Sequence, residues 1–207
     1  MGPGNRASLS APRLRGQIRG RRYARDVQFE IVTLVVSPVR RYDGRPSDGP
    51  RPYDGRETAD EVQVRAHKGL VGDRYFGTKH RFAAVTFLAS ESIDSLEGEL
   101  GTGPFDPALA RRNVITRGLD VESLLHTTFT IDAGSGPIPF LALTRANPCA
   151  FMNGAFADGA QQAMRGNAGI RTEPLADGVL RVGPATLLDV VPLAPEELSR
   201  RRRTAVS

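Results

Sequence analysis

The sequence predicts a mainly β domain with an antiparallel, barrel-like sheet and a few short helices. Short segments rich in β-branched residues recur along the chain, turn residues separate them, and no long amphipathic helix connects one to the next. A doubly wound α/β sheet would need such crossover helices. The 207 residues, of which 40% are hydrophobic and 25% charged, are typical of one globular domain with tails.

Eight segments are expected to be strands, because each is short, β-branched or alternating, and bounded by turn residues. They are residues 27–37, 61–66, 82–88, 113–116, 128–131, 139–144, 179–182 and 185–191. The first, VQFEIVTLVVS, stops at Pro38 and is typical of a largely buried strand. A turn at Gly183-Pro184 joins the last two.

Loops and short helices are expected between these strands. Residues 40–58 are dense in Gly, Pro and Asp and should form an exposed loop with two turns. Gly69 and Gly72 permit a tight turn. A short helix should begin near Ser90, and a helical turn should cover residues 121–125.

The positive charge is concentrated at the two ends of the chain. The net charge is +5, but residues 1–26 contain seven arginines and one acid, and residues 200–203 are all arginine. Residues 27–195 hold 17 basic and 20 acidic residues, a net charge of −3. We therefore predict a disordered Arg-rich leader over 1–26, one domain over 27–195 and a disordered basic tail over 196–207. Such ends can attract polyanions without sequence preference, and specific nucleic-acid binding is not expected.

Apolar runs are too short for a membrane-spanning helix or a secretory signal. A single cysteine cannot form an internal disulfide, which agrees with a reducing compartment. The sequence therefore predicts a cytoplasmic protein without a membrane partner.

Cys149 is the candidate reactive residue. It follows Asn147 and Pro148 after a predicted strand, and an Asn cap with Pro in the first helical position commonly begins a helix. A thiol in that first turn would have a lowered pKa, because the free backbone N–H groups and the helix dipole favour an anion. A free cysteine can equally be an inert buried hydrophobe, and the residues alone leave both readings open.

Three basic clusters could bind a phosphate, because arginine binds phosphate oxygens in a bidentate way. They are Arg111-Arg112-Asn113, the stretch from Lys68 to Arg74, and Lys79-His80-Arg81. Each taken alone could simply be solvated. The histidines are too scattered for a zinc site, and no GxSxG, Rossmann or P-loop motif is present.

Five motifs in order give a more specific indication: Val36-Ser37-Pro38, Lys68-Gly69-Leu70-Val71-Gly72-Asp73-Arg74, Arg111-Arg112-Asn113-Val114, Asn147-Pro148-Cys149, and Gly178-Val179-Leu180-Arg181-Val182-Gly183. Together they resemble the MOSC family, the C-terminal domain of molybdenum cofactor sulfurases. The family also occurs in amidoxime-reducing enzymes and as small stand-alone bacterial proteins. The resemblance spans about residues 30–191.

The resemblance implies a β-barrel-like MOSC fold and a bound molybdenum cofactor (molybdopterin). Cys149 matches the family's cysteine, which either ligates molybdenum or carries sulfur as a persulfide. Arg112 and Asn113 match positions in the cofactor pocket, where they would hold the pterin and its phosphate. Further candidates for cofactor binding are Arg111, Arg74, Lys68 and Asn147.

Three departures from the family pattern concern the shape of the pocket. Tyr75 stands where members often have His after Gly-Asp-Arg, and Arg165-Gly166-Asn167 replaces a Gly-Gly pair after an arginine. The loop at 40–58 is also long for the family.

Three functions stay open at this point. The chain could reduce N-hydroxylated compounds with Cys149 as molybdenum ligand and electrons from a partner protein. It could instead be a sulfur carrier or sulfurtransferase that receives a persulfide on Cys149 from a cysteine desulfurase. It could also be a non-enzymatic protein that binds polyanions through its arginine tails.

Overall fold

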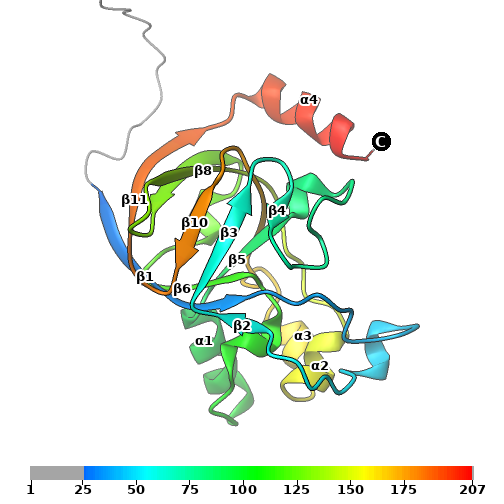
Figure 1. The fold of residues 1–207 in the computed structure, drawn as a ribbon. Coiled ribbons are helices and arrows are strands. Elements are labelled where there is room, and N and C mark those ends of the chain that lie inside the picture. The colour runs from blue at the N-terminus through cyan, green and yellow to red at the C-terminus, as the bar shows by residue number, and fades with distance from the viewer. Residues whose placement is uncertain (1–25, 207) are drawn as a thin grey trace, which may run out of the picture.

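Seven strands close into a barrel in the computed structural model, which describes residues 26–206 (Figure 1). The strand order is β11-β7-β8-β9-β5-β6-β1, and β1 pairs back onto β11. Every neighbouring pair in the ring is antiparallel except β5 and β6. The strands are β1 (Val27–Val35), β5 (Val85–Ala89), β6 (Val114–Arg117), β7 (Thr127–Asp132), β8 (Pro137–Arg145), β9 (Ile170–Pro174) and β11 (Gly183–Pro192). The predicted mainly β, barrel-like fold is confirmed.

The barrel interior is filled by apolar side chains from alternate strand positions. In β7 every second residue is buried, as expected for a strand with one face on a core. The rings of Phe87, Phe129 and Phe140 meet there with centroids 5.2–5.6 Å apart. Burial of these large rings is a main source of the barrel's stability.

A second, three-stranded sheet lies against the barrel in the order β10-β3-β4. Its strands are β10 (Gly178–Arg181), β3 (Glu61–Arg65) and β4 (Gly69–Leu70), and the short β2 (Thr58–Ala59) extends the barrel sheet beside β1. The two strands predicted around Gly183 both exist, but they do not pair with each other. β10 pairs with β3, whereas β11 pairs with β1 and β7, so the turn moves the chain from one sheet to the other.

Three helices lie at one end of the barrel and a fourth lies at the other end (Figure 1). They are α1 (Glu91–Leu100), α2 (Phe151–Ala155), α3 (Ala160–Ala163) and α4 (Pro195–Val206). The first three enclose a second apolar core that includes Ile93, Leu96, Phe151 and Met164. Short 3-10 turns lie at Pro46–Asp48, Arg81–Ala83, Pro107–Ala110 and Glu122–Leu124.

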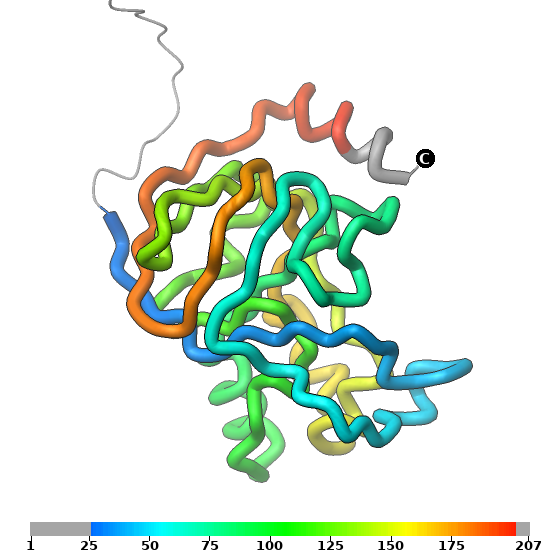
Figure 2. The backbone as a smooth tube through the Cα atoms, viewed as in Figure 1, coloured from blue at the N-terminus to red at the C-terminus, as the bar shows by residue number. Residues whose placement is uncertain are grey.

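The long loop after β1 packs against α2 (Figure 2). The Tyr42 ring lies 5.9 Å from the ring of Phe151, centroid to centroid. Gly154 in α2 approaches the loop so closely that an added Cβ would lie 2.9 Å from the Cα of Gly49. The loop predicted over 40–58 is therefore real, but part of it is held on the helix that follows Cys149.

Some expectations from the sequence differ from the structure. The helix expected to include Pro148 begins only at Phe151, so Cys149 lies before the first turn and not within it. The tail expected to be disordered over 196–207 contains α4, which Glu197 and Arg201 stabilise by an ion pair at 2.8 Å one turn apart. The strand expected from Phe82 begins at Val85, because residues 81–83 form a 3-10 turn. The leader expected over 1–26 lies, apart from Asp26, outside the described residues.

Within the described residues, no helix has the length and apolar character needed to cross a membrane.

Candidate functional site

A pocket of about 470 Å³, which we call the arginine pocket, brings together the ends of several strands and loops. Five arginines line it: Arg40, Arg74, Arg111, Arg112 and Arg171. Tyr75, His80 and Phe82 add aromatic surface, and no Asp or Glu is part of the lining. A concave site with several cations and no acid is suited to an anionic ligand.

Arg112 is held in the pocket wall by three backbone carbonyls. Its Nε donates to the carbonyl of Ala168 (2.9 Å), and its two terminal nitrogens donate to the carbonyls of Ala110 (3.1 Å) and Ala146 (3.0 Å). No carboxylate among the described residues pairs with it. A guanidinium has five N–H donors, so two are left for a ligand.

The charge of Arg112 is poorly compensated by the protein. Its pKa is lowered to about 10, chiefly by burial and then by the neighbouring charge of Arg171, with a smaller contribution from Arg74. Cys149 and Tyr75 act in the opposite direction. Cys149 and Arg112 are therefore close enough for the charge of one to act on the other.

Arg111 has a different role from its neighbour in the chain. Its backbone is left-handed (φ 54°), and its side chain donates to Glu57 Oε1 (2.6 Å), Ser37 Oγ (2.8 Å) and the carbonyl of Val39 (3.0 Å). Arg41 and Ser37 also bind the Glu57 carboxylate. Arg111 therefore fastens both ends of the long loop and has its charge neutralised by Glu57.

Asn113 is buried and its amide is fully used within the protein. Its Nδ2 donates to the carbonyl of Val35 (3.0 Å) and to Asp73 Oδ2 (3.2 Å), and its Oδ1 accepts from the backbone N–H (3.0 Å) and hydroxyl (2.9 Å) of Thr86. This bonding supports the pocket wall. The predicted role of Asn113 as a direct ligand of the cofactor stays a prediction.

The Arg74 side chain makes fewer polar contacts within the protein than the side chains of Arg111 and Arg112. Its guanidinium lies 3.9 Å from Asp73 Oδ2 and stacks over the Tyr75 ring, 4.7 Å from the centroid. Gly69 and Gly72 shape the turn that leads to it, with φ of 102° and 91°, as the sequence predicts. Tyr75, which departs from the family pattern, therefore fixes an arginine in the pocket.

Cys149 is a half-buried free thiol that does not itself line this pocket. It packs against the second apolar core, and its backbone carbonyl accepts from Met152 N–H (2.9 Å). Its neighbour Asn147 is exposed and is not part of the pocket lining, although Ala146 is. The structure thus joins Arg112 to the segment that precedes Cys149, through the carbonyl of Ala146, and leaves Asn147 at the surface.

Lys68 is also separate from the lining. It is exposed, its backbone takes part in the β3–β4 turn, and its charge lowers the pKa of Asp177 after the larger effects of Ala66 and Arg65. The structure therefore gathers Arg74, Arg111, Arg112 and Asn113 in one pocket and leaves Lys68 outside it.

Two arginines of the lining, Arg40 and Arg171, do not belong to any motif of the sequence. Arg40 follows β1, and Arg171 lies in β9, a strand that the sequence pattern does not predict. His80 belongs to a basic cluster that the sequence did indicate. Only the closure of the barrel brings these three together, and no local signal could have found the two arginines.

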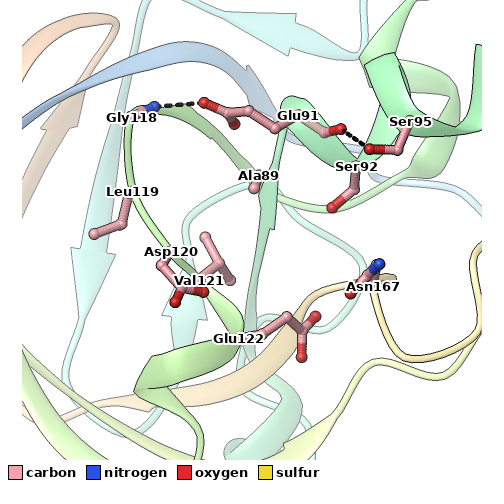
Figure 3. Close-up of a pocket in the computed structure, with 10 residues that line it drawn as sticks. All are labelled: Ala89, Glu91, Ser92, Ser95, Gly118, Leu119, Asp120, Val121, Glu122 and Asn167. Carbon is pink, nitrogen blue, oxygen red and sulfur yellow. Dashed lines mark hydrogen bonds between the residues drawn. The ribbon is translucent and has the colours of Figure 1, made fainter. Parts of the chain in front are cut away.

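A second pocket of about 370 Å³ has the opposite charge (Figure 3). Glu91, Asp120 and Glu122 line it, and Glu91 accepts from Gly118 N–H at 2.7 Å. Burial raises the pKa of Glu122, and the charge of Asp120 adds to this effect. Its acidic lining does not suit a phosphorylated ligand, so the arginine pocket is the candidate site.

The part of the chain that the structure describes holds no group of three or more His, Cys, Asp or Glu side chains arranged to bind a metal ion. The arginine pocket itself is lined by guanidinium groups and aromatic rings, and Cys149 is not part of its lining.

Comparison with known proteins agrees with this architecture. The MOSC domain family model matches residues 66–185, more than half of the chain. Among curated proteins, none matches the chain by sequence.

Solved structures share the fold at low sequence identity. The YuaD protein from Bacillus subtilis is similar, with a TM-score of 0.60 at 15% identity, over 82% of this chain and 99% of that chain. YiiM from Geobacillus stearothermophilus gives a TM-score of 0.51 at 17% identity, over 77% and 74%. YiiM from Escherichia coli gives 0.51 at 20% identity, over 77% and 69%. With the family model, the barrel and the order of the motifs in agreement, this chain belongs to the MOSC domain family.

Proposed function

We propose that the arginine pocket and Cys149 bind the molybdenum cofactor and that the protein reduces N-hydroxylated compounds. MOSC domains are in general associated with binding of this cofactor. The observation that carries the proposal is Arg112, a cation without a carboxylate partner in a pocket with no acidic lining, which binds the carbonyl of Ala146 three residues before the half-buried thiol of Cys149.

The residues present fit this group. A free metal ion would need several protein ligands, which the described residues do not supply. The dithiolene of the pterin would supply soft ligands to molybdenum, and the thiolate of Cys149 would be a further ligand of the same kind. The unused donors of Arg112, together with Arg74, would then hold the phosphate of the pterin.

The bound group would supply two-electron oxygen-atom transfer at molybdenum. Reduction of an N–OH group breaks the N–O bond, consumes two electrons and two protons, and releases water. The chain's part is to hold the cofactor at Cys149 and Arg112 and to exclude water with Tyr75 and Phe82. His80 lies on the lining and can donate a proton to the departing oxygen. The electrons come from a partner protein.

An activity assay tests the reductase. Protein loaded with cofactor in vivo is supplied with electrons from a reduced viologen dye and a simple N-hydroxylated base. We expect oxidation of the dye in step with formation of the reduced base, and its loss in Cys149→Ser. Wild-type protein that contains the cofactor but does not consume the N-hydroxylated base contradicts the reductase function.

A second candidate is a sulfur carrier or sulfurtransferase, because the same partly accessible thiol beside a cation could hold a persulfide. A cysteine desulfurase would transfer one sulfur atom to the Cys149 sulfur. Intact-mass spectrometry after incubation with a desulfurase and cysteine should then show the mass of one added sulfur, reversed by a thiol reductant. An unchanged mass contradicts the carrier function.

A further inference from the structure

Arg40 and Arg171 stand apart from the other arginines of the pocket. Both are exposed, and both side chains contribute to the lining, although they are distant in the sequence. Within the described part of the chain, neither guanidinium has a hydrogen bond or an ion pair. Two cations thus converge on one pocket without a protein acceptor.

Arg111 and Arg112, in contrast, are held by contacts within the protein. Arg111 is neutralised by Glu57, and Arg112 is fixed by three carbonyls beside Cys149. The charge of Arg171 lowers the pKa of Arg112, so these like charges destabilise each other while no anion is bound. An anion between them would remove this repulsion and would bind more tightly for that reason.

Aromatic rings line the same pocket as Arg40 and Arg171. The His80 and Phe82 rings meet edge to face, with centroids 6.4 Å apart, and Tyr75 lies under Arg74. All three line the same pocket. A flat ring that carries an oxyanion would contact these apolar faces and the guanidinium groups at once.

We propose that Arg40 and Arg171 form a substrate subsite for an oxyanion, a phosphate or a carboxylate, attached to an aromatic or heteroaromatic ring. This inference rests on the proposed function, in which the Cys149 and Arg112 part of the pocket holds the cofactor. It adds the class of substrate: an anionic N-hydroxylated compound. The two arginines fix its charged group through bidentate hydrogen bonds.

Calorimetric titration of the full chain, expressed in cells that make the cofactor, tests the subsite. The probes are adenosine 5′-monophosphate against adenosine, and benzoate against benzamide, so that phosphate and carboxylate are distinguished. The variants are Arg40→Gln, Arg171→Gln and the double variant. The matched control is Arg181→Gln, whose exposed arginine pairs with Glu61 on β3.

We expect at least one anionic probe to bind about tenfold or more tightly than its uncharged counterpart, because a charge-assisted hydrogen bond is lost without the anion. Each substitution at Arg40 or Arg171 should weaken the anion by about tenfold and leave the uncharged probe unchanged. Arg181→Gln should bind as the wild type does. Anions that bind no better than neutral probes, or equally well to the double variant, overturn the proposal.

The molybdenum and pterin contents of the same samples separate this inference from the proposed function. A double variant with wild-type content supports a substrate subsite. A double variant that loses the cofactor shows that Arg40 and Arg171 hold the cofactor itself, which overturns the subsite and supports cofactor binding. Wild-type protein without molybdenum contradicts the proposed function and, with it, the assignment of the anion as a substrate.

Discussion

Arg112 shows how one residue can serve both the fold and the site. It ties Ala110, Ala146 and Ala168 together through their carbonyls and keeps two N–H groups for the pocket. A lysine could keep the charge, but its single ammonium cannot reach three carbonyls in fixed directions.

Arg112→Lys is therefore expected to lower the free energy of unfolding by about 2–4 kcal/mol, because buried carbonyls lose their donors. Urea unfolding monitored by circular dichroism measures the change. Arg181→Lys, at an exposed ion pair, should stay within about 0.5 kcal/mol of the wild type. Equal effects of the two substitutions would show that the Arg112 bonds do not hold the site together.

Glu57 gives a pH-dependent contribution to stability. Burial alone raises its pKa, but hydrogen bonds from Ser37 and Arg111 and the charges of Arg111 and Arg41 outweigh this, so the pKa lies below its ordinary value of 4.5. A carboxylate with a lowered folded-state pKa stabilises the protein above its unfolded-state pKa, and this contribution is lost as the pH falls through the folded-state value.

Glu57→Gln should accordingly lower the free energy of unfolding by about 1–3 kcal/mol near neutral pH. The difference from the wild type should begin to shrink as the pH falls below 4.5, where the carboxylate of the unfolded chain is protonated first. It should be lost only below the lowered folded-state pKa, where the folded carboxylate is protonated too. Urea midpoints of both proteins across this range provide the measurement. A difference that is constant with pH would exclude the ion-pair explanation.

At the scale of elements, the long loop and α2 form one unit beside Cys149. Tyr42 packs on Phe151, and Gly154 leaves room for Gly49 and Pro50. The loop therefore contributes to the shape of the site, although it was expected from sequence to be exposed.

Gly154→Ala should destabilise the protein by about 1–3 kcal/mol, because its Cβ would meet backbone and a proline ring at 2.9–3.0 Å. Gly98→Ala in α1 is the matched control: its Cβ meets nothing within 4 Å, and alanine should stabilise the helix by about 0.5–1 kcal/mol. Thermal unfolding and limited proteolysis of the loop measure both. Gly154→Ala with wild-type stability and proteolysis would show that the loop is not packed on α2.

Elements with a local signal could be predicted, and elements that depend on distant contacts could not. β1 was expected because VQFEIVTLVV is β-branched and ends at Pro38. The sequence does not predict β9 because this strand contains the charged Glu173. The buried Glu173 carboxylate lies 2.7 Å from His67 Nδ1 and 3.5 Å from Arg81 Nε, and both partners are distant in the sequence.

In the candidate site, too, some residues have a local sequence signal and others depend on distant contacts. The motif at 111–113 marked the pocket wall, but the left-handed backbone of Arg111, which directs its side chain to Glu57, has no sequence signal. Arg40 and Arg171 converge only when the barrel closes. The sequence motif therefore predicts the wall of the pocket. Arg40 and Arg171 enter the lining only through the topology of the barrel.

For the molecule as a whole, the folded domain and the two ends of the chain differ in the sign of their net charge. Residues 27–195 have a net charge of −3, whereas the leader adds seven arginines. Any general attraction to polyanions should therefore reside in the ends, and ligand binding should reside in the barrel.

A chain without residues 1–26 should leave a heparin column at lower salt than the full chain, since counterion release falls with the number of arginines. Its molybdenum content should be unchanged, because the arginine pocket lies within the described barrel. Unchanged heparin retention would place the polyanion-binding surface elsewhere. A loss of molybdenum would show that the leader takes part in the site.

The most direct test of cofactor binding is metal and pterin analysis of the wild type and Cys149→Ser. Both are expressed in cells that make the molybdenum cofactor, purified without oxygen, and checked for equal thermal unfolding. We expect molybdenum and pterin absorbance in the wild type and their loss in Cys149→Ser. Equal molybdenum in both proteins would contradict Cys149 as the ligand, and no molybdenum in either would contradict cofactor binding and favour the persulfide carrier.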